Sequence, residues 1–143
     1  MPYARPDNSA EVAMECRQMM KNGDNPFPKW YGYLASDPAI MEQARIPMEQ
    51  IQGPVLLISG AADGMWSSAA LNESAVQRLK QEDFPHSIEH VSYRGAGHET
   101  GIPYIYVTAN KFSGGTKQDT AKASIASWNR TIDFFKDNAS KTE

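Results

Sequence analysis

The sequence is poor in cysteine, in basic charge and in long apolar runs. Its 143 residues include one cysteine, Cys16, which can form neither an internal disulfide nor a thiolate zinc site. Fourteen Lys and Arg against 17 Asp and Glu give a formal net charge of −3 without a basic block, so we expect no nucleic-acid partner. No apolar run approaches the roughly 20 residues of a membrane span, and no apolar signal region follows Met1. If Met1 is the native start, these absences predict a cytoplasmic protein.

The residues that are present have the composition of an ordinary folded domain. Hydrophobic residues make up 41% of the chain and charged residues 22%, which argues against a disordered chain. The length fits one domain or part of one.

Residues 1–45 are expected to form a helical connecting segment. Ser9 is a candidate N-cap, and the apolar residues after it recur at helical spacing until Asn22-Gly23 ends the helix. Residues 24–33 are interpreted as a loop because two prolines interrupt them. Pro38, after Ser36-Asp37, suits the first position of a second, short helix.

Residues 46–137 are expected to form an α/β segment, followed by a polar tail at 138–143. The run Val55–Ile58, bounded by glycines and a proline, predicts a strand buried on both faces, as in a parallel sheet covered by helices. The later pattern predicts a helix at 67–81, a strand at 88–93, a weaker strand at 104–108 and a last helix at 118–136. Strands joined by a helix favour a right-handed parallel crossover.

Two strands alone do not make a stable sheet. Val55–Ile58 is suited to neighbours on both sides, and only the strand at 88–93 is convincing as one. We therefore expect the parallel sheet to be incomplete in this chain. A further segment, or a second copy of the chain, would complete it.

The candidate chemistry follows the two strands. Asp63 comes after the first strand and His98 after the second, each next to glycines, and the carboxyl ends of adjacent parallel strands meet at one edge of a sheet. A carboxylate that accepts a hydrogen bond from one ring nitrogen leaves the other nitrogen free as a general base. The alternatives are that Asp63 caps the following helix and that His98 is a surface loop residue. The occurrence of both residues at matching strand ends favours the catalytic interpretation.

The longer pattern is more specific. It comprises Ile46-Pro47-Met48-Glu49-Gln50-Ile51, Gly53-Pro54-Val55-Leu56-Leu57-Ile58-Ser59-Gly60 with Asp63 and Trp66, Phe84-Pro85-His86, Tyr93-x-Gly95-Ala96-Gly97-His98, Gly114-Gly115-Thr116, and Trp128 with Phe134-Phe135. Over about residues 46–135, this pattern resembles the C-terminal domain of the acyl-CoA thioesterase and bile acid-CoA:amino acid N-acyltransferase family. That family is related to dienelactone hydrolase within the α/β-hydrolase fold.

The resemblance implies that this chain is the C-terminal portion of an α/β-hydrolase fold. Asp63 and His98 would then be the acid and base of a Ser/Cys-His-Asp triad that acts on an acyl thioester or ester. The sequence contains no Gly-x-Ser-x-Gly or Gly-x-Cys-x-Gly, so it lacks the nucleophile elbow of this fold. We therefore expect the nucleophile to lie outside these residues and the chain alone to be inactive.

The other candidate residues are better explained by structure than by chemistry. Cys16 lies on the apolar stripe of the first helix and is expected in the core. His86 and His90 with Glu89 are interpreted as a solvated strand edge, so no metal is expected. Gly114-Gly115-Thr116 lacks the setting of a phosphate loop and is expected to position the N-terminus of the last helix. No cofactor is expected. The aromatic group Phe27, Trp30, Tyr31 and Tyr33 either lines an acyl pocket or packs its segment on the core, with packing slightly favoured.

Two alternatives stay open at this point. One is a degenerate hydrolase module without activity, which self-associates to complete its sheet. The other is a fragment of an ester, dienelactone or peptide hydrolase, because the acid and histidine turns are common to the whole fold.

Overall fold

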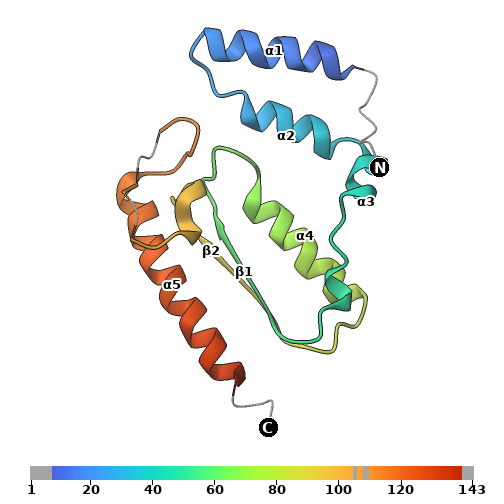
Figure 1. The fold of residues 1–143 in the computed structure, drawn as a ribbon, viewed down its shortest axis with the longest axis vertical. Helices are drawn as coiled ribbons and strands as arrows, with labels where there is room; N and C mark the ends of the chain where they lie inside the picture. Colours follow the sequence, from blue (N-terminus) through green and yellow to red (C-terminus); the bar gives the residue numbers. More distant parts are fainter. Residues whose placement is uncertain (1–7, 105, 108–109, 140–143) are drawn as a thin grey trace.

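The computed structural model describes residues 8–104, 106–107 and 110–139 (Figure 1). Helices and strands alternate after an N-terminal group of three helices. The helices are α1 Ser9–Lys21, α2 Phe27–Ala35, α3 Pro38–Gln43, α4 Ser68–Gln81 and α5 Lys117–Ala139; the strands are β1 Val55–Gly60 and β2 Ile88–Tyr93; and the short 3₁₀ turns are η1 Met48–Gln50 and η2 His98–Gly101.

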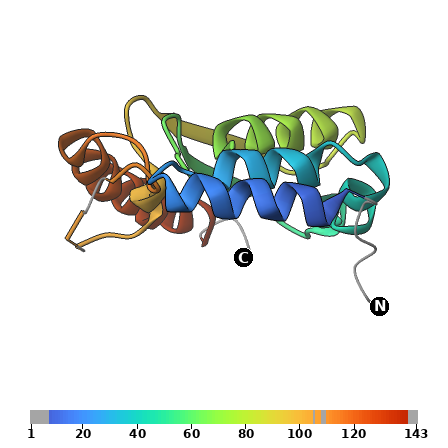
Figure 2. The ribbon, with the colours of Figure 1, turned by 90° about the horizontal axis from the view of Figure 1, so that it is seen from above.

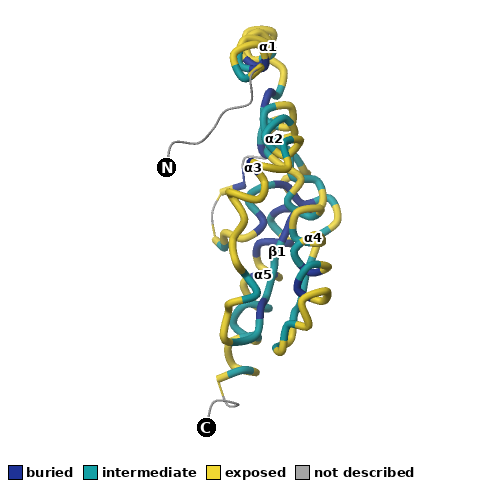
Figure 3. The backbone as a smooth tube through the Cα atoms, turned by 90° about the vertical axis from the view of Figure 1, so that its right-hand side faces the viewer, coloured by how far each residue is buried: buried dark blue, intermediate teal, exposed yellow. Residues whose placement is uncertain are grey.

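The sheet consists of β1 and β2, which run parallel in a register that pairs Val55 with Ile88 and Gly60 with Tyr93. Helix α4 connects the two strands and lies on one face of the sheet, while α5 lies on the other face (Figures 1 and 3). The predicted parallel strand–helix–strand unit is therefore confirmed, and the described residues form a mixed α/β fold. Among them, no second strand pairs with β1, whose other edge is open.

Helices α1 and α2 lie side by side beyond the end at which both strands finish (Figures 1 and 2). The prediction of a loop at 24–33 was wrong, because α2 begins at Phe27. Its two prolines are at the cap and in the first turn, where a missing N–H costs no helical hydrogen bond. The position before α1 is occupied by Asn8 and not by Ser9, which is already helical. Asp37 caps α3 as predicted, with its Oδ1 accepting from the Ala39 and Ile40 N–H groups.

Helix α5 turns an unexpected face to the protein. Its buried side consists of small residues, namely Thr120, Ala123, Ser124 and Ser127. The apolar residues whose spacing predicts the helix lie mainly outside: Ile125 is 51%, Trp128 39% and Phe135 67% exposed. The helix continues to Ala139, so the first two residues of the expected tail are helical, and residues 140–143 lie outside the described part.

Residues 104–108 fall partly outside the described residues, at 105 and 108. Tyr104, Tyr106 and Val107 are not in a strand, so the weak strand prediction is not supported there. Within the described residues, no helix is both long and apolar enough to cross a membrane.

Candidate functional site

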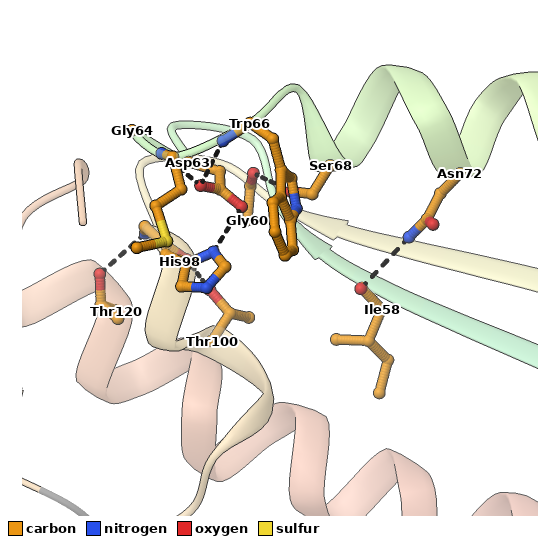
Figure 4. Close-up of polar contacts among 12 residues, drawn as sticks. Ile58, Gly60, Asp63, Gly64, Trp66, Ser68, Asn72, His98, Thr100 and Thr120 are labelled. Carbon is orange, nitrogen blue, oxygen red and sulfur yellow. Dashed lines mark hydrogen bonds and ion pairs between the residues drawn. The ribbon is translucent and has the colours of Figure 1, made fainter. Parts of the chain in front are cut away.

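The carboxyl ends of β1 and β2 bring Asp63 and His98 together, as the sequence predicts (Figure 4). Asp63 follows β1 in a short loop, and His98 begins η2 directly after the glycine turn that follows β2. The Nδ1 of His98 lies 3.1 Å from the Asp63 Oδ2 and donates a hydrogen bond to it. The Asp63 side chain is only 4% exposed, whereas the His98 side chain is 30% exposed. The carboxylate is thus shielded from water while the ring remains accessible.

Hydrogen bonds within its own loop hold the Asp63 carboxylate in place. Its Oδ1 accepts from the N–H groups of Met65 at 2.8 Å and Trp66 at 3.3 Å, which leaves Oδ2 for His98. Both donors precede α4, whose cap position is Ser67. Asp63 therefore organises the turn after β1 and does not cap the helix, so the simpler structural interpretation accounts for only one of its two oxygens.

The segment 110–116 holds the histidine turn against the acid loop. The Ser113 carbonyl accepts from both the His98 N–H at 2.8 Å and the Gly64 N–H at 3.1 Å. Gly114 and Gly115 adopt φ values of +70° and +64°, and a Cβ at Gly115 would overlap the backbone of Ala96 and Gly97. These two glycines thus allow the close approach of the backbones that fixes His98.

Thr116, the last residue of this segment, forms side-chain hydrogen bonds with Asp119 in the first turn of α5. Its Oγ1 accepts from the Asp119 N–H at 3.0 Å and donates to the Asp119 carboxylate at 2.7 Å. The expectation that Gly114-Gly115-Thr116 positions a helix N-terminus is confirmed.

One residue of the site, Asn25, had no role in the sequence argument, and another, Trp66, entered it only as part of the family pattern. The Asn25 Nδ2 donates to the carbonyls of Gly64 at 2.6 Å and Lys111 at 2.7 Å, and so ties the α1–α2 connection to the acid loop. The Trp66 ring lies edge-to-face with His98 at a centroid distance of 4.9 Å. The sequence carries no signal for Asn25, because its partners are 39 and 86 positions away.

The predicted aromatic group divides between packing and lining a cavity. Phe27 packs edge-on against Phe112 with centroids 5.9 Å apart. Tyr31 instead lies 5.1 Å from Trp66 and lines a cavity of about 220 Å³ between α2, α3 and the start of α4. Packing is therefore confirmed for Phe27, whereas Tyr31 lines a cavity whose acyl occupant stays a prediction.

The remaining candidate residues lie away from this end of the sheet. Cys16 is buried in α1, with its Sγ 3.8 Å from the Pro26 carbonyl oxygen, as expected for a core residue. His90 is 2.9 Å from Ser59 Oγ and 11% exposed, so the prediction of a solvated strand edge was wrong for it. No group of three metal-ligating side chains occurs within the part of the chain that the structure describes.

The clearest electrostatic perturbation lies on the α5 face of β2. Arg130 forms a bidentate ion pair with Glu89, and its hydrogen bonds hold the pKa of the Glu89 carboxyl below the ordinary value of 4.5. The same pair raises the pKa of Arg130. Burial raises the pKa of Tyr93 at the end of that strand. These groups fasten α5 to the sheet and take no part in the Asp63–His98 pair.

Comparison with known proteins places this chain in a family. Residues 8–141 match the family described as BAAT / Acyl-CoA thioester hydrolase C terminal. The peroxisomal succinyl-coenzyme A thioesterase of Mus musculus is 30% identical in an alignment of 99 residues, which covers 63% of this chain and 23% of that protein. The chain thus spans less than a quarter of the length of this relative. Because the family match covers nearly all residues of this chain, the chain belongs to the BAAT / acyl-CoA thioester hydrolase C-terminal family.

Proposed function

We propose that this chain supplies the acid and the general base of an acyl-transfer reaction on a thioester or an ester, within an α/β-hydrolase fold. The observation that carries the proposal is the hydrogen bond from His98 Nδ1 to a shielded Asp63, which leaves Nε2 without a partner among the described residues. Family membership and the name of the mouse relative favour thioesters over other substrates. Peptide, dienelactone and simple ester substrates remain alternatives within the same fold.

In this reaction the Asp63–His98 pair moves one proton twice. With Nδ1–H held by Asp63, the lone pair of Nε2 accepts the proton of a serine hydroxyl or cysteine thiol as that atom attacks the acyl carbonyl. The resulting imidazolium, stabilised by Asp63, returns the proton to the departing thiolate or alkoxide. Water or an amine then attacks the acyl intermediate, with His98 acting once more as base.

The nucleophile is proposed to come from outside these 143 residues. Ser59, Ser67 and Ser68 are the serines nearest Asp63 in sequence, and none stands in a Gly-x-Ser-x-Gly turn. Ser59 is 3% exposed within β1, and Ser68 Oγ lies 3.3 Å from the Gly60 carbonyl, to which it donates. Neither placement presents a hydroxyl to His98 Nε2.

Two surfaces support the proposal that a further segment completes the fold. No strand among the described residues pairs with the outer edge of β1, where the Ile58 and Gly60 carbonyls accept from side chains of α4, and such an edge ordinarily pairs with another strand. Exposed Ile125, Trp128 and Phe135 give α5 an apolar outer face. A preceding hydrolase segment that covers both would also bring the nucleophile elbow and the oxyanion donors to the strand ends.

The same surfaces support a second candidate, a non-catalytic module that self-associates. It accounts for the open edge of β1, but it requires neither the shielded carboxylate nor the free ring nitrogen. Size-exclusion chromatography that gives a compact, folded monomer would count against it.

The first experiment examines the histidine itself in the 143-residue chain. Long-range ¹H–¹⁵N NMR correlations are expected to show His98 as the Nδ1–H tautomer, and Asp63→Asn is expected to disturb that preference. The Nε2–H tautomer in the unsubstituted chain would contradict the proposed base.

The second experiment looks for the nucleophile with a fluorophosphonate probe and an intact α/β-hydrolase as positive control. We expect no labelling of the 143-residue chain, and labelling of the longest protein that contains it. Labelling of the 143 residues that His98→Ala blocks would place the nucleophile within them. A coding region upstream without a Gly-x-Ser/Cys-x-Gly turn would overturn the proposal of a segment that supplies it.

A further inference from the structure

The cavity beside the site has a lining without charge. It lies between α2, α3 and the start of α4, holds about 220 Å³, and is bounded by residues that include Tyr31, Gly32, Met41, Trp66 and Leu71. None of its lining residues among the described part of the chain is acidic or basic. Such a cavity accommodates an apolar group and offers no partner to a carboxylate.

Trp66 connects this cavity to the catalytic pair. One side of its ring system lies edge-to-face with Tyr31 at 5.1 Å, and it also meets His98 at 4.9 Å. A second cavity of about 210 Å³, lined by Asp63, Ser67 and Ser68, shares Trp66 with the first. A group held in the apolar cavity is therefore separated from the His98 ring by a single side chain.

Gly32 lines the cavity on the α2 side without a side chain. It is an interior residue of α2 without a positive φ, and a Cβ built on it would meet no atom within 4 Å. Neither a turn nor a close approach requires glycine here, and glycine inside a helix lowers stability relative to alanine. Gly32 is exposed and lines the cavity, so a side chain at this position would stand at the cavity wall.

We propose that this cavity binds the apolar, uncharged end of the acyl group whose carbonyl reacts at His98, and that Gly32 sets how deep that end can reach. This inference rests on the proposed function and adds to it a specificity for the kind of acyl group. A dicarboxylic acyl group would place its second carboxylate in the cavity without a cation, at a large desolvation cost. This chain thus selects against the kind of acyl group, succinyl, that the name of the mouse relative carries.

The test uses binding, so that it does not depend on turnover. The ¹⁵N-labelled 143-residue chain is titrated with octanoate and, separately, with octanedioate, which has the same chain length and a second carboxylate. Octanoate is expected to shift the Gly32 amide and the Trp66 indole N–H, and octanedioate to bind at least about tenfold more weakly. A folded spectrum with no shift at these two groups, or equal binding of the two acids, overturns the proposal.

Substitution at Gly32 locates the site. Gly32→Phe fills the cavity and is expected to abolish the octanoate shifts, while Gly32→Ala weakens binding only a few-fold. Gly53→Phe is the matched control, because Gly53 also has open space around it and does not line the cavity. Octanoate binding that Gly32→Phe leaves intact, or that Gly53→Phe reduces equally, overturns the assignment. If Gly32→Phe does not fold, Gly32→Ala against Gly53→Ala decides in the same way.

The outcome is separable from that of the proposed function. His98→Ala removes the proposed base but none of the residues that line the apolar cavity, so octanoate is expected to shift the Gly32 amide in that variant as well. If octanoate binds with the expected selectivity but His98 is the Nε2–H tautomer, the proposed specificity holds and the proposed role of His98 as a base is overturned. A correct tautomer without octanoate binding would do the reverse.

Discussion

Two histidines of this chain lie beside carboxylates, and their surroundings differ in what they leave free. His98 stands at the end of the sheet, with Nδ1 3.1 Å from Asp63 Oδ2 and Nε2 without a partner in the described part of the chain. His90 stands inside β2, with Nδ1 3.6 Å from Glu73 and Nε2 2.9 Å from Ser59 Oγ. By residue type, the arrangement around His90 is closer to a catalytic triad, because it contains a serine, a histidine and an acid.

The presence of the three groups does not by itself make a site that a substrate can reach. Ser59 is 3% exposed in a regular strand, where no substrate carbonyl can reach its hydroxyl. Glu73 is 58% exposed, so water competes with His90 for its carboxylate, whereas the Asp63 side chain is 4% exposed. Among the described residues, the Asp63–His98 pair at the strand ends combines a shielded acid with a ring nitrogen that has no partner.

The largest expected effect separates the two histidines by activity. In the longest protein that contains this chain and hydrolyses a thioester, we expect His98→Ala to lower kcat by about 10⁴-fold or more. His90→Ala, away from the reacting atoms, should change kcat by no more than a few-fold. Release of free thiol measures both variants, and similar losses from the two would break the comparison.

The glycine turn that holds His98 is the next test. Gly115→Ala forces a side chain into a left-handed backbone and against the backbone of Ala96 and Gly97, so we expect a loss of about 3 kcal/mol of unfolding free energy. Gly23→Ala is the control, because its φ is also positive at +81° but the only atom near is the end of the Lys111 side chain. Chemical denaturation compares the two. A loss no greater at Gly115 than at Gly23 would contradict the proposed close packing.

The buried bond of His90 predicts a purely structural effect. Ser59→Ala leaves the His90 Nε2 without its partner in a largely buried position, which is expected to cost about 1–3 kcal/mol of stability. The tautomer of His98 should remain as it was. Denaturation and histidine NMR on the same sample check both statements, and a changed His98 tautomer would show that the two histidines are coupled.

The smallest effect concerns the opposite face of β2, where Glu89 meets Arg130. Because this pair lowers the pKa of Glu89, the unfolded chain binds the proton more tightly than the folded chain, and the pair stabilises the fold above the ordinary pKa of 4.5. That contribution is lost as the pH falls below this value through the folded-state pKa. Thermal unfolding from pH 6 to pH 3 should show a flatter acid decline for Glu89→Gln and for Arg130→Gln. A decline as steep as that of the unsubstituted chain would mean that the pair contributes nothing.

Some elements could be predicted from the sequence because their signals are local. The bounds of β2 and the start of α3 follow from propensity and from an Asp-Pro cap. The prediction of a loop over α2 was wrong because proline breaks a helix interior but suits a first turn. The sequence does not say which of these positions a proline occupies. The solvated interpretation of His90 failed because Ser59 and Glu73 come from β1 and α4, which only folding brings alongside.

The sequence by itself determined the α/β class, the family likeness, and the choice of Asp63 and His98, because an acid and a histidine beside glycines after two buried strands form a local and directional pattern. Only the tertiary structure decided that Oδ2 and not Oδ1 of Asp63 meets the ring, and that Trp66 both contacts His98 and lines an apolar cavity together with Gly32. It also decided that α5 buries its small residues and exposes its apolar ones. Such facts depend on distances between segments far apart in the chain, and side-chain packing sets these distances.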